Sequence, residues 1–159
     1  MIKIPDIYSD WPIVIGQHLT CREDTLWQLL KQPKHLELFH PFVDKIEVTQ
    51  WPGDGAHDFV HYLSGLVLER RIKRWEDTNL TILILQGGRE NTDVLWHSQP
   101  HDDTTVDLWI GLRPLWSSTV SVKPRLEQYL SGVLKGLAYY VETGQPVQPN
   151  QFGKVSVFS

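Results

Sequence analysis

Apolar residues in the last third of the chain recur with the spacing of one helix face. They stand at i, i+3, i+4, i+7, i+8, i+11, i+14 and i+15: Leu126, Tyr129, Leu130, Val133, Leu134, Leu137, Tyr140 and Val141. This 3.6-residue period predicts an amphipathic helix of about 20 residues, roughly 30 Å long. Pro124 fits its first turn, and Gly144 and Pro146 fit its end. Because no other predicted helix has this length, we expect the apolar face to pack on a sheet.

The first half of the chain begins with a strand pattern and two short helical patterns. Residues 13–19 alternate between apolar and smaller or polar side chains, which predicts a strand. The segment Thr20–Glu23 fits a capping box that starts a short helix through Leu30. Pro33 opens a second short helical segment, which Pro41 ends.

Six further strand patterns follow, at about residues 43–51, 57–63, 66–76, 80–86, 92–99 and 104–113. The breaks between them are short and rich in Gly, Pro, Asn and Asp, so neighbouring strands must pair antiparallel. The predicted fold class is α+β: a seven-stranded, curved antiparallel sheet around a long C-terminal helix, with two short helices between strands 1 and 2. No repeat or linker divides the chain, which predicts a single domain over residues 1–159 with a C-terminal tail at 146–159.

The order of these elements resembles the START-like or SRPBCC superfamily, whose architecture is the helix-grip fold. Two segments carry the resemblance: DTLWQLLKQPKHLELFHPFV from Asp24 to Val43, and LEQYLSGVLKGLAYYVETGQPVQPNQFG from Leu126 to Gly153. The second is similar to the closing helix and tail of bacterial polyketide cyclase-like members. The resemblance implies a cavity between the sheet and the helix. It implies no catalytic residues, because the superfamily has no universal catalytic motif and includes carriers, cyclases and chaperone cofactors.

Charge and cysteine content narrow the classes of partner. The net charge of −4 argues against nucleic-acid binding, which needs a basic surface. The basic run at Arg70, Arg71, Lys73 and Arg74 is interpreted as a solvated sheet face. No apolar stretch reaches the roughly 18 residues of a membrane span, and no signal-peptide pattern is visible. With a single cysteine as well, we expect a cytoplasmic protein without an integral membrane segment, and leave open a homodimer.

Aromatic residues are abundant: seven Trp, five Tyr and five Phe. They either fill the core or line a pocket. A dry void of about 500 Å³ would cost on the order of 12 kcal/mol, so a real cavity must hold ligand or water, or be filled by its own aromatics. Gly132 and Gly136 indicate either close approach of a strand to the helix or room for a ligand. The candidate ligand-binding residues are Trp27, Phe39, Phe42, Phe59, Tyr62, Trp75, Trp96, Trp109, Tyr129, Val133, Gly136 and Tyr140.

The polar residues that are candidates for catalysis or metal binding are scattered along the sequence. His40, His61 and Arg70 are candidate catalytic groups, beside Tyr129 and Tyr140. A second set crowds one predicted turn: His97, His101, Asp102 and Asp103. Because a structural zinc site needs four convergent ligands, this set is interpreted as an ordinary polar turn, and no metal or cofactor is expected.

Three functions follow from these patterns. The first is binding or carriage of a hydrophobic small molecule, such as a lipid, polyketide or quinone-like compound. The second is an enzyme of the cyclase or dehydrase type, with acid/base residues in the cavity. The third is a protein-interaction module, in which the tail after Gly144 docks on a partner rather than on the domain itself. The absence of a visible nucleophile or carboxylate pair favours the non-catalytic role over the enzyme.

Overall fold

The computed structural model describes residues 2–116 and 119–159. In chain order the elements are η1 (Asp6–Tyr8), β1 (Ile13–Leu19), α1 (Glu23–Leu30), α2 (Leu36–Phe39), β2 (Val43–Gln50), β3 (His57–Tyr62), β4 (Val67–Glu76), β5 (Asn79–Gln86), β6 (Arg89–Pro100), β7 (Val106–Pro114) and α3 (Thr119–Thr143). The strands form one antiparallel seven-stranded sheet in the order β1-β7-β6-β5-β4-β3-β2. The predicted α+β architecture, with two short helices between strands 1 and 2, is confirmed.

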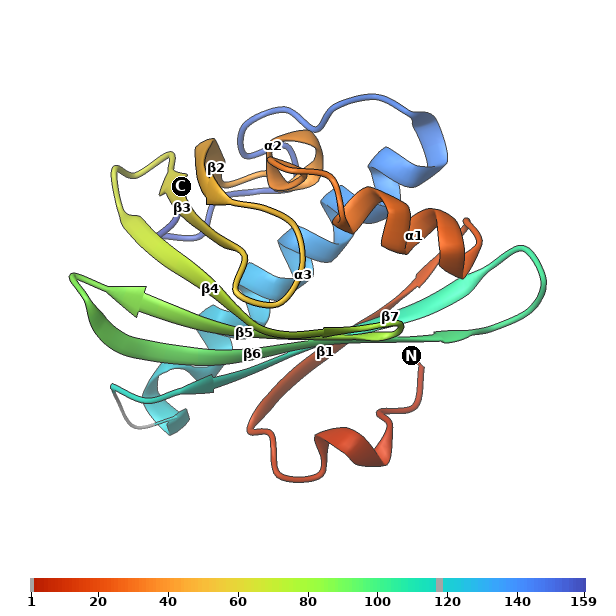
Figure 1. Ribbon diagram of the computed structural model, residues 1–159, viewed down its shortest axis with the longest axis horizontal. Coiled ribbons are helices and arrows are strands. Elements are labelled where there is room, and N and C mark those ends of the chain that lie inside the picture. The colour runs from red at the N-terminus through yellow and green to blue at the C-terminus, as the bar shows by residue number, and fades with distance from the viewer. Residues whose placement is uncertain (1, 117–118) are drawn as a thin grey trace.

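The two faces of the sheet are covered differently (Figure 1). The helices α1, α2 and α3 lie on one face, which we call the inner face. The N-terminal segment with η1 lies on the other, the outer face. Most of the buried apolar residues form one cluster on the inner side, where Leu130, Val133 and Leu137 of α3 belong to the same cluster as Ile82 and Ile110 of the strands. The predicted packing of the apolar helix face on the sheet is therefore present.

Two predicted helix starts are wrong. Helix α1 begins at Glu23 after Arg22, and no side chain caps it, so Thr20 stands too far upstream for a capping box. The carboxylate of Glu23 instead accepts a hydrogen bond from Ser98 on β6 at 2.7 Å. Helix α3 is longer than predicted, because it begins at Thr119 and contains Pro124 in its interior. Its end is as predicted, since Gly144 follows it with a positive φ of 73°.

The glycines of α3 allow close contact with the segment around α2. A Cβ on Gly136 would lie 2.1 Å from the backbone oxygen of Phe39, and a Cβ on Gly132 would lie 2.8 Å from the Phe42 ring. Of the two alternatives, the close approach of a strand is wrong, because the segment that approaches these glycines is the one around α2. Helix α2 contacts both α3 and the edge strand β2.

A small second core covers the outer face. It consists of Tyr8, Leu95 and Trp109, with Trp11 and Val14 packed against them. The Tyr8 hydroxyl lies 2.9 Å from the carbonyl oxygens of both Leu95 and Trp109. Sequence analysis did not predict this core, because the N-terminal segment has neither helical nor strand periodicity.

The C-terminal tail docks on the domain itself. The amide of Val147 donates to the carbonyl of Leu38 at 3.0 Å, and that of Asn150 donates to the carbonyl of Pro41 at 2.9 Å. Val155 and Phe158 are buried in the main core. This contact removes the argument that the tail is held ready for a partner. No helix within the described residues is both long and apolar enough to cross a membrane.

Candidate ligand-binding cavity

A cavity of about 250 Å³ lies between the inner face of the sheet and α3. Strands β3 to β7, the start of α2, helix α3 and the tail all contribute to its wall. The wall is mainly apolar: Leu36, Val60, Leu66, Leu68, Ile82, Ile84, Val94, Trp96, Ile110, Leu112, Leu126, Leu130, Val133 and Phe158. The periodicity that builds the fold also produces this wall, because alternate strand residues and one helix face point to the same interior.

The cavity reaches the surface near the turn between β5 and β6. Trp116, which is 53% exposed, and the exposed Val157 line this part. Gln86 and Asn91 flank the turn and are hydrogen-bonded to each other at 3.2 Å. These exposed lining residues mark the side on which the cavity opens to solvent.

Three polar side chains from distant segments meet at a buried part of the wall. His40 follows α2, Tyr62 ends β3, and Tyr129 lies on α3. The Nε2 atom of His40 is 2.8 Å from the Tyr129 hydroxyl, which is 2.9 Å from the Tyr62 hydroxyl. The ring of Phe158 lies against both tyrosines, at centroid distances of 4.1 Å from Tyr129 and 5.1 Å from Tyr62. The three groups form one hydrogen-bonded chain, which we call the polar chain.

Every member of the polar chain is uncharged near neutral pH, and burial moves the pKa of each further from neutrality. Burial, helped by the positive charge of Arg70, lowers the pKa of His40 to about 3. Burial likewise raises the pKa of Tyr62 to about 12, and it raises the pKa of Tyr129 well above that of a free phenol. The polar chain can donate and accept hydrogen bonds but carries no charge.

A count of hydrogens shows what the polar chain can offer a ligand. The backbone N–H of Phe42 donates to Nδ1 of His40 at 3.2 Å, which assigns the imidazole hydrogen to Nε2. The Nε2–H therefore donates to Tyr129, and one of the two phenol hydrogens is used between Tyr129 and Tyr62. One phenol hydrogen remains, and neither hydroxyl has a further hydrogen bond within the described residues. The polar chain thus has one spare hydrogen-bond donor, on one of two tyrosines that line the cavity.

Arg70 also lines the cavity, in a buried ion pair with Asp58. Its Nε and Nη2 atoms lie 2.8 and 2.6 Å from the two carboxylate oxygens. The interpretation of residues 70–74 as a solvated basic face is therefore wrong for Arg70, because strand alternation turns it inward while Arg71 and Lys73 point outward. Since the guanidinium is matched by a carboxylate, the site needs no charged ligand.

Six sequence-predicted site residues come together at the cavity. They are His40, Tyr62, Arg70, Trp96, Tyr129 and Val133. Sequence analysis missed most of the aliphatic wall, because it could not determine which half of each strand faces inward. The alternating pattern of β5 does carry the information once Ile82 is known to be buried beneath α3.

The other predicted residues lie elsewhere. Trp27 donates its indole N–H to Ser98, Phe39 and Gly136 meet at the α2–α3 contact, and Trp109 belongs to the outer core. His61 on β3 lies 2.5 Å from Glu47 on the neighbouring edge strand β2. Four aromatics pack outside the cavity wall: Phe42 against Tyr129, Phe59 against His57, Trp75 against Trp51, and Tyr140 against the main core.

The polar chain does not form a metal centre. It offers one imidazole and two phenols, and the carboxylate of Asp58 is paired with Arg70. Metal centres of nitrogen and oxygen ligands require several histidines or free carboxylates.

Comparison with known proteins identifies the fold. No protein-family model and no curated protein matches this sequence. A START superfamily protein from Mycobacterium smegmatis is similar over 84% of this chain and 98% of its own, with a TM-score of 0.70 and 14% identity. Truncated norcoclaurine synthase from Thalictrum flavum is similar over 82% and 92%, with a TM-score of 0.66 and 13% identity. The Aha1 dimer from Colwellia psychrerythraea is similar over 83% and 96%, with a TM-score of 0.65 and 10% identity.

These similarities cover most of the chain and most of each neighbour, and they show that the protein has the START-like, helix-grip fold. The neighbours' names include an enzyme and a START protein, so the fold alone does not select a function.

Proposed function

We propose that this protein binds an uncharged hydrophobic small molecule that carries a hydrogen-bond acceptor, such as a carbonyl oxygen. The observation that carries the proposal is the combination of an apolar cavity with one spare phenol hydrogen at its buried polar chain. Lipids, polyketides and quinone-like compounds with a carbonyl group meet this description.

The energetics of an empty cavity support occupancy. The cavity opens to the surface, so the cost of a closed, dry void of about 250 Å³, about 6 kcal/mol at roughly 24 cal/mol per Å³, is an upper limit. That is a large share of the stability of a domain. Water would relieve this cost poorly along the aliphatic wall, because a buried water needs two to four polar partners. An apolar ligand that also accepts the spare hydrogen satisfies both parts of the site.

The same site supports binding better than catalysis. General acid–base catalysis works best with a group whose pKa lies near the working pH. In the polar chain the pKa of His40 is lowered to about 3 and that of Tyr62 is raised to about 12. These groups hold their protons in place at neutral pH, which suits orientation of a ligand and not proton transfer.

Equilibrium dialysis with menadione, a neutral naphthoquinone, tests the proposal against 2-methylnaphthalene, a hydrocarbon of similar shape without an acceptor. We expect both to bind, and menadione to bind more tightly by roughly three- to tenfold, the value of one ordinary hydrogen bond. Ile84→Phe places a larger side chain in the cavity wall and should weaken both ligands. Thr81→Phe, at a β5 position that strand alternation turns to the outer face, should weaken neither.

The double variant Tyr62→Phe/Tyr129→Phe, made in a His40→Leu background, separates the two parts of the proposal. The His40 substitution is needed because loss of the Tyr129 hydroxyl would otherwise free the Nε2–H of His40 to donate to the ligand. All these donors are then lost, so menadione should bind only as tightly as the hydrocarbon. If neither probe binds the unaltered protein, and native mass spectrometry of the purified protein finds no bound molecule, the proposed function is wrong. If both bind equally well before and after the substitution, the cavity binds apolar molecules and the acceptor requirement is wrong.

A further inference from the structure

Two histidines and an aspartate form a cluster on the outer face of the sheet, away from the cavity. His18 lies near the end of β1, Asp107 near the start of β7, and His101 in the turn between β6 and β7. Within the described residues this is the group of histidine, cysteine and acidic side chains that could hold a metal ion. Sequence analysis noted His101 but grouped it with its neighbours in the turn, because His18 is far away in the sequence.

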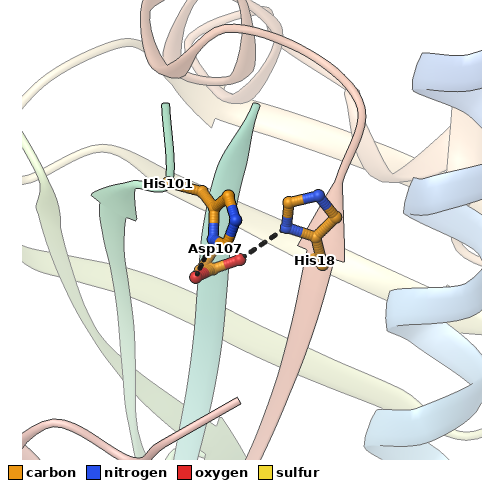
Figure 2. A group of neighbouring side chains, drawn as sticks. All are labelled: His18, His101 and Asp107. Carbon is orange, nitrogen blue, oxygen red and sulfur yellow. Dashed lines mark hydrogen bonds and ion pairs between the residues drawn. The ribbon is translucent and has the colours of Figure 1, made fainter. Parts of the chain in front are cut away.

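The three side chains converge on one point (Figure 2). The Nδ1 atom of His18 is 2.7 Å from one carboxylate oxygen of Asp107, and Nδ1 of His101 is 3.3 Å from the other. The two imidazole rings meet edge to face with their centroids 4.6 Å apart. One potential ligand atom from each residue lies within 4.8 Å of the other two.

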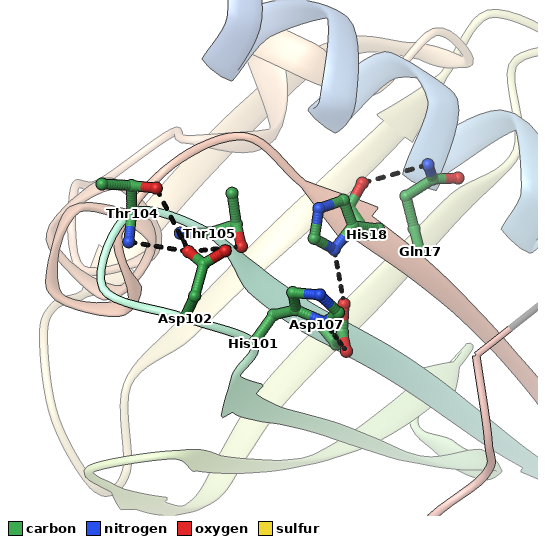
Figure 3. Close-up of polar contacts among 7 residues, drawn as sticks. All are labelled: Gln17, His18, His101, Asp102, Thr104, Thr105 and Asp107. Carbon is green, nitrogen blue, oxygen red and sulfur yellow. Dashed lines mark hydrogen bonds and ion pairs between the residues drawn. The ribbon is translucent and has the colours of Figure 1, made fainter.

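The fold places these residues before any ion arrives (Figure 3). His18 and Asp107 are direct partners in the β1–β7 pairing, so their side chains stand on the same face of the sheet. The turn that carries His101 is fixed by Asp102, whose Oδ1 accepts hydrogen bonds from the backbone N–H groups of Thr104 and Thr105 at 2.9 and 2.8 Å. The amide of His101 in turn donates to the carbonyl of Thr105 at 3.1 Å.

We propose that His18, His101 and Asp107 form a binding site for a divalent late transition-metal ion such as Zn²⁺. Two imidazole nitrogens and one carboxylate oxygen are ligands that Zn²⁺ prefers, and three protein ligands leave one tetrahedral position for water or another molecule. Around a zinc ion with bonds of roughly 2.0–2.2 Å, ligand atoms lie about 3–3.5 Å apart. Here each histidine Nδ1 lies 2.7 or 3.3 Å from a carboxylate oxygen and the three ligand atoms lie within 4.8 Å of one another, so small side-chain rotations must complete the set. The side chains of His18 and His101 are 41% and 54% exposed, so their rings can rotate to adjust.

The other histidine–carboxylate contacts in the described part of the chain lack this arrangement. His61 lies beside Glu47 without a second histidine. His57 contacts Glu69, but that carboxylate also lies 3.4 Å from the guanidinium of Arg71, and a nearby positive charge opposes a metal cation. These two contacts therefore supply matched controls on the same sheet.

Isothermal titration of the metal-free full chain with Zn²⁺ tests the site, and the visible absorption of bound Co²⁺ reports its coordination. We expect one ion per chain. His101→Asn, in an exposed turn, and His18→Asn should each weaken binding by roughly tenfold or more, since even loss of an indirect partner of a metal site costs about that much. His61→Asn should bind as the unaltered chain does. Circular dichroism of each variant establishes that it is folded.

Thermal unfolding gives a second readout. An ion that binds only the folded chain raises its unfolding temperature. Zn²⁺ should raise it for the unaltered chain and for His61→Asn, but not for His101→Asn. The proposal is overturned if the unaltered chain binds no Zn²⁺, or if His101→Asn and His18→Asn bind it as tightly as the unaltered chain does. Neither result depends on whether the cavity on the inner face binds a small molecule.

Discussion

The outer face of the sheet is densely packed, whereas the inner face borders a cavity. On the outer face, Tyr8 and Trp109 fit against backbone that glycines leave bare: a Cβ on Gly111 would lie 2.7 Å from the Tyr8 ring, and a Cβ on Gly16 would lie 2.6 Å from Trp109. On the inner face, aliphatic side chains line the sheet and α3 and leave about 250 Å³ between them. Dense packing thus comes from large rings placed opposite glycines, and space comes from strands and a helix held apart.

The ion pairs on the two faces also differ in their burial. The outer-face ion pair between Arg113 and Asp93 is partly exposed, with its charged atoms 3.9 Å apart. The inner-face pair of Arg70 and Asp58 is buried and has two short hydrogen bonds. Buried polar groups must be paired, so the inner face tolerates substitutions of its polar residues less well than the outer face does.

The largest difference is expected for the two ion pairs. Asp58→Asn leaves the Arg70 guanidinium buried without its counter-charge, which should lower the free energy of unfolding by about 3–5 kcal/mol. Asp93→Asn should lower it by at most about 1 kcal/mol, because water replaces the lost partner. Urea unfolding measures both. Equal losses in the two variants would show that the inner pair is not isolated from solvent.

A pH dependence should also arise on the inner side. Burial lowers the pKa of both His35 and His40 to about 3, whereas each titrates near 6.5 in the unfolded chain. Below pH 6.5 the unfolded chain therefore binds more protons than the folded chain, and the free energy of unfolding decreases as the pH is lowered. Between pH 7.5 and 5 the loss should be about 2 kcal/mol for each histidine. His40→Gln should remove about half of this dependence in urea unfolding. If the dependence persists unchanged, other groups cause it.

The substitution Gly111→Ala tests whether this glycine leaves room for the Tyr8 ring on the outer face. The added methyl group would displace the Tyr8 ring, which its hydroxyl bonds to β6 and β7 hold in place, at a cost of about 1–3 kcal/mol. In a Tyr8→Ala background the same substitution should cost less, because the closest ring is gone and the Trp11 ring lies farther away, at 3.1 Å from the added Cβ. A double-mutant cycle by urea unfolding measures this coupling. Additive effects would mean that the glycine serves some other purpose.

The smallest effect is expected for Tyr8→Phe. It removes one hydroxyl that bridges two carbonyl oxygens and keeps the ring, so the free energy of unfolding should fall by about 1 kcal/mol. Menadione binding should stay the same, in contrast to the double tyrosine variant of the inner face. A change in menadione affinity would show that the two faces are coupled through the sheet.

The periodicity of the chain determined the architecture. The apolar face of α3 and the alternation of seven strands fix which elements form and that they must cover each other, because each has one apolar side to bury. The first residues of the helices were less predictable. The capping box at Thr20 and the helix start at Pro124 were wrong, since local propensity at a terminus is weak beside tertiary contacts such as that of Glu23 with Ser98.

Tertiary structure alone decided the chemistry. His40, Tyr62 and Tyr129 come from three separate segments, as do His18, His101 and Asp107, and nothing in their sequence spacing brings them together. Strand phase decided that Arg70 points inward and Arg71 outward, and a shift of one residue would reverse them. The sequence states which residues are apolar at which period. Which polar residues meet depends on the register and order of the strands. Hydrogen bonds and metal coordination require atoms a few ångströms apart, and only the folded chain brings these residues that close.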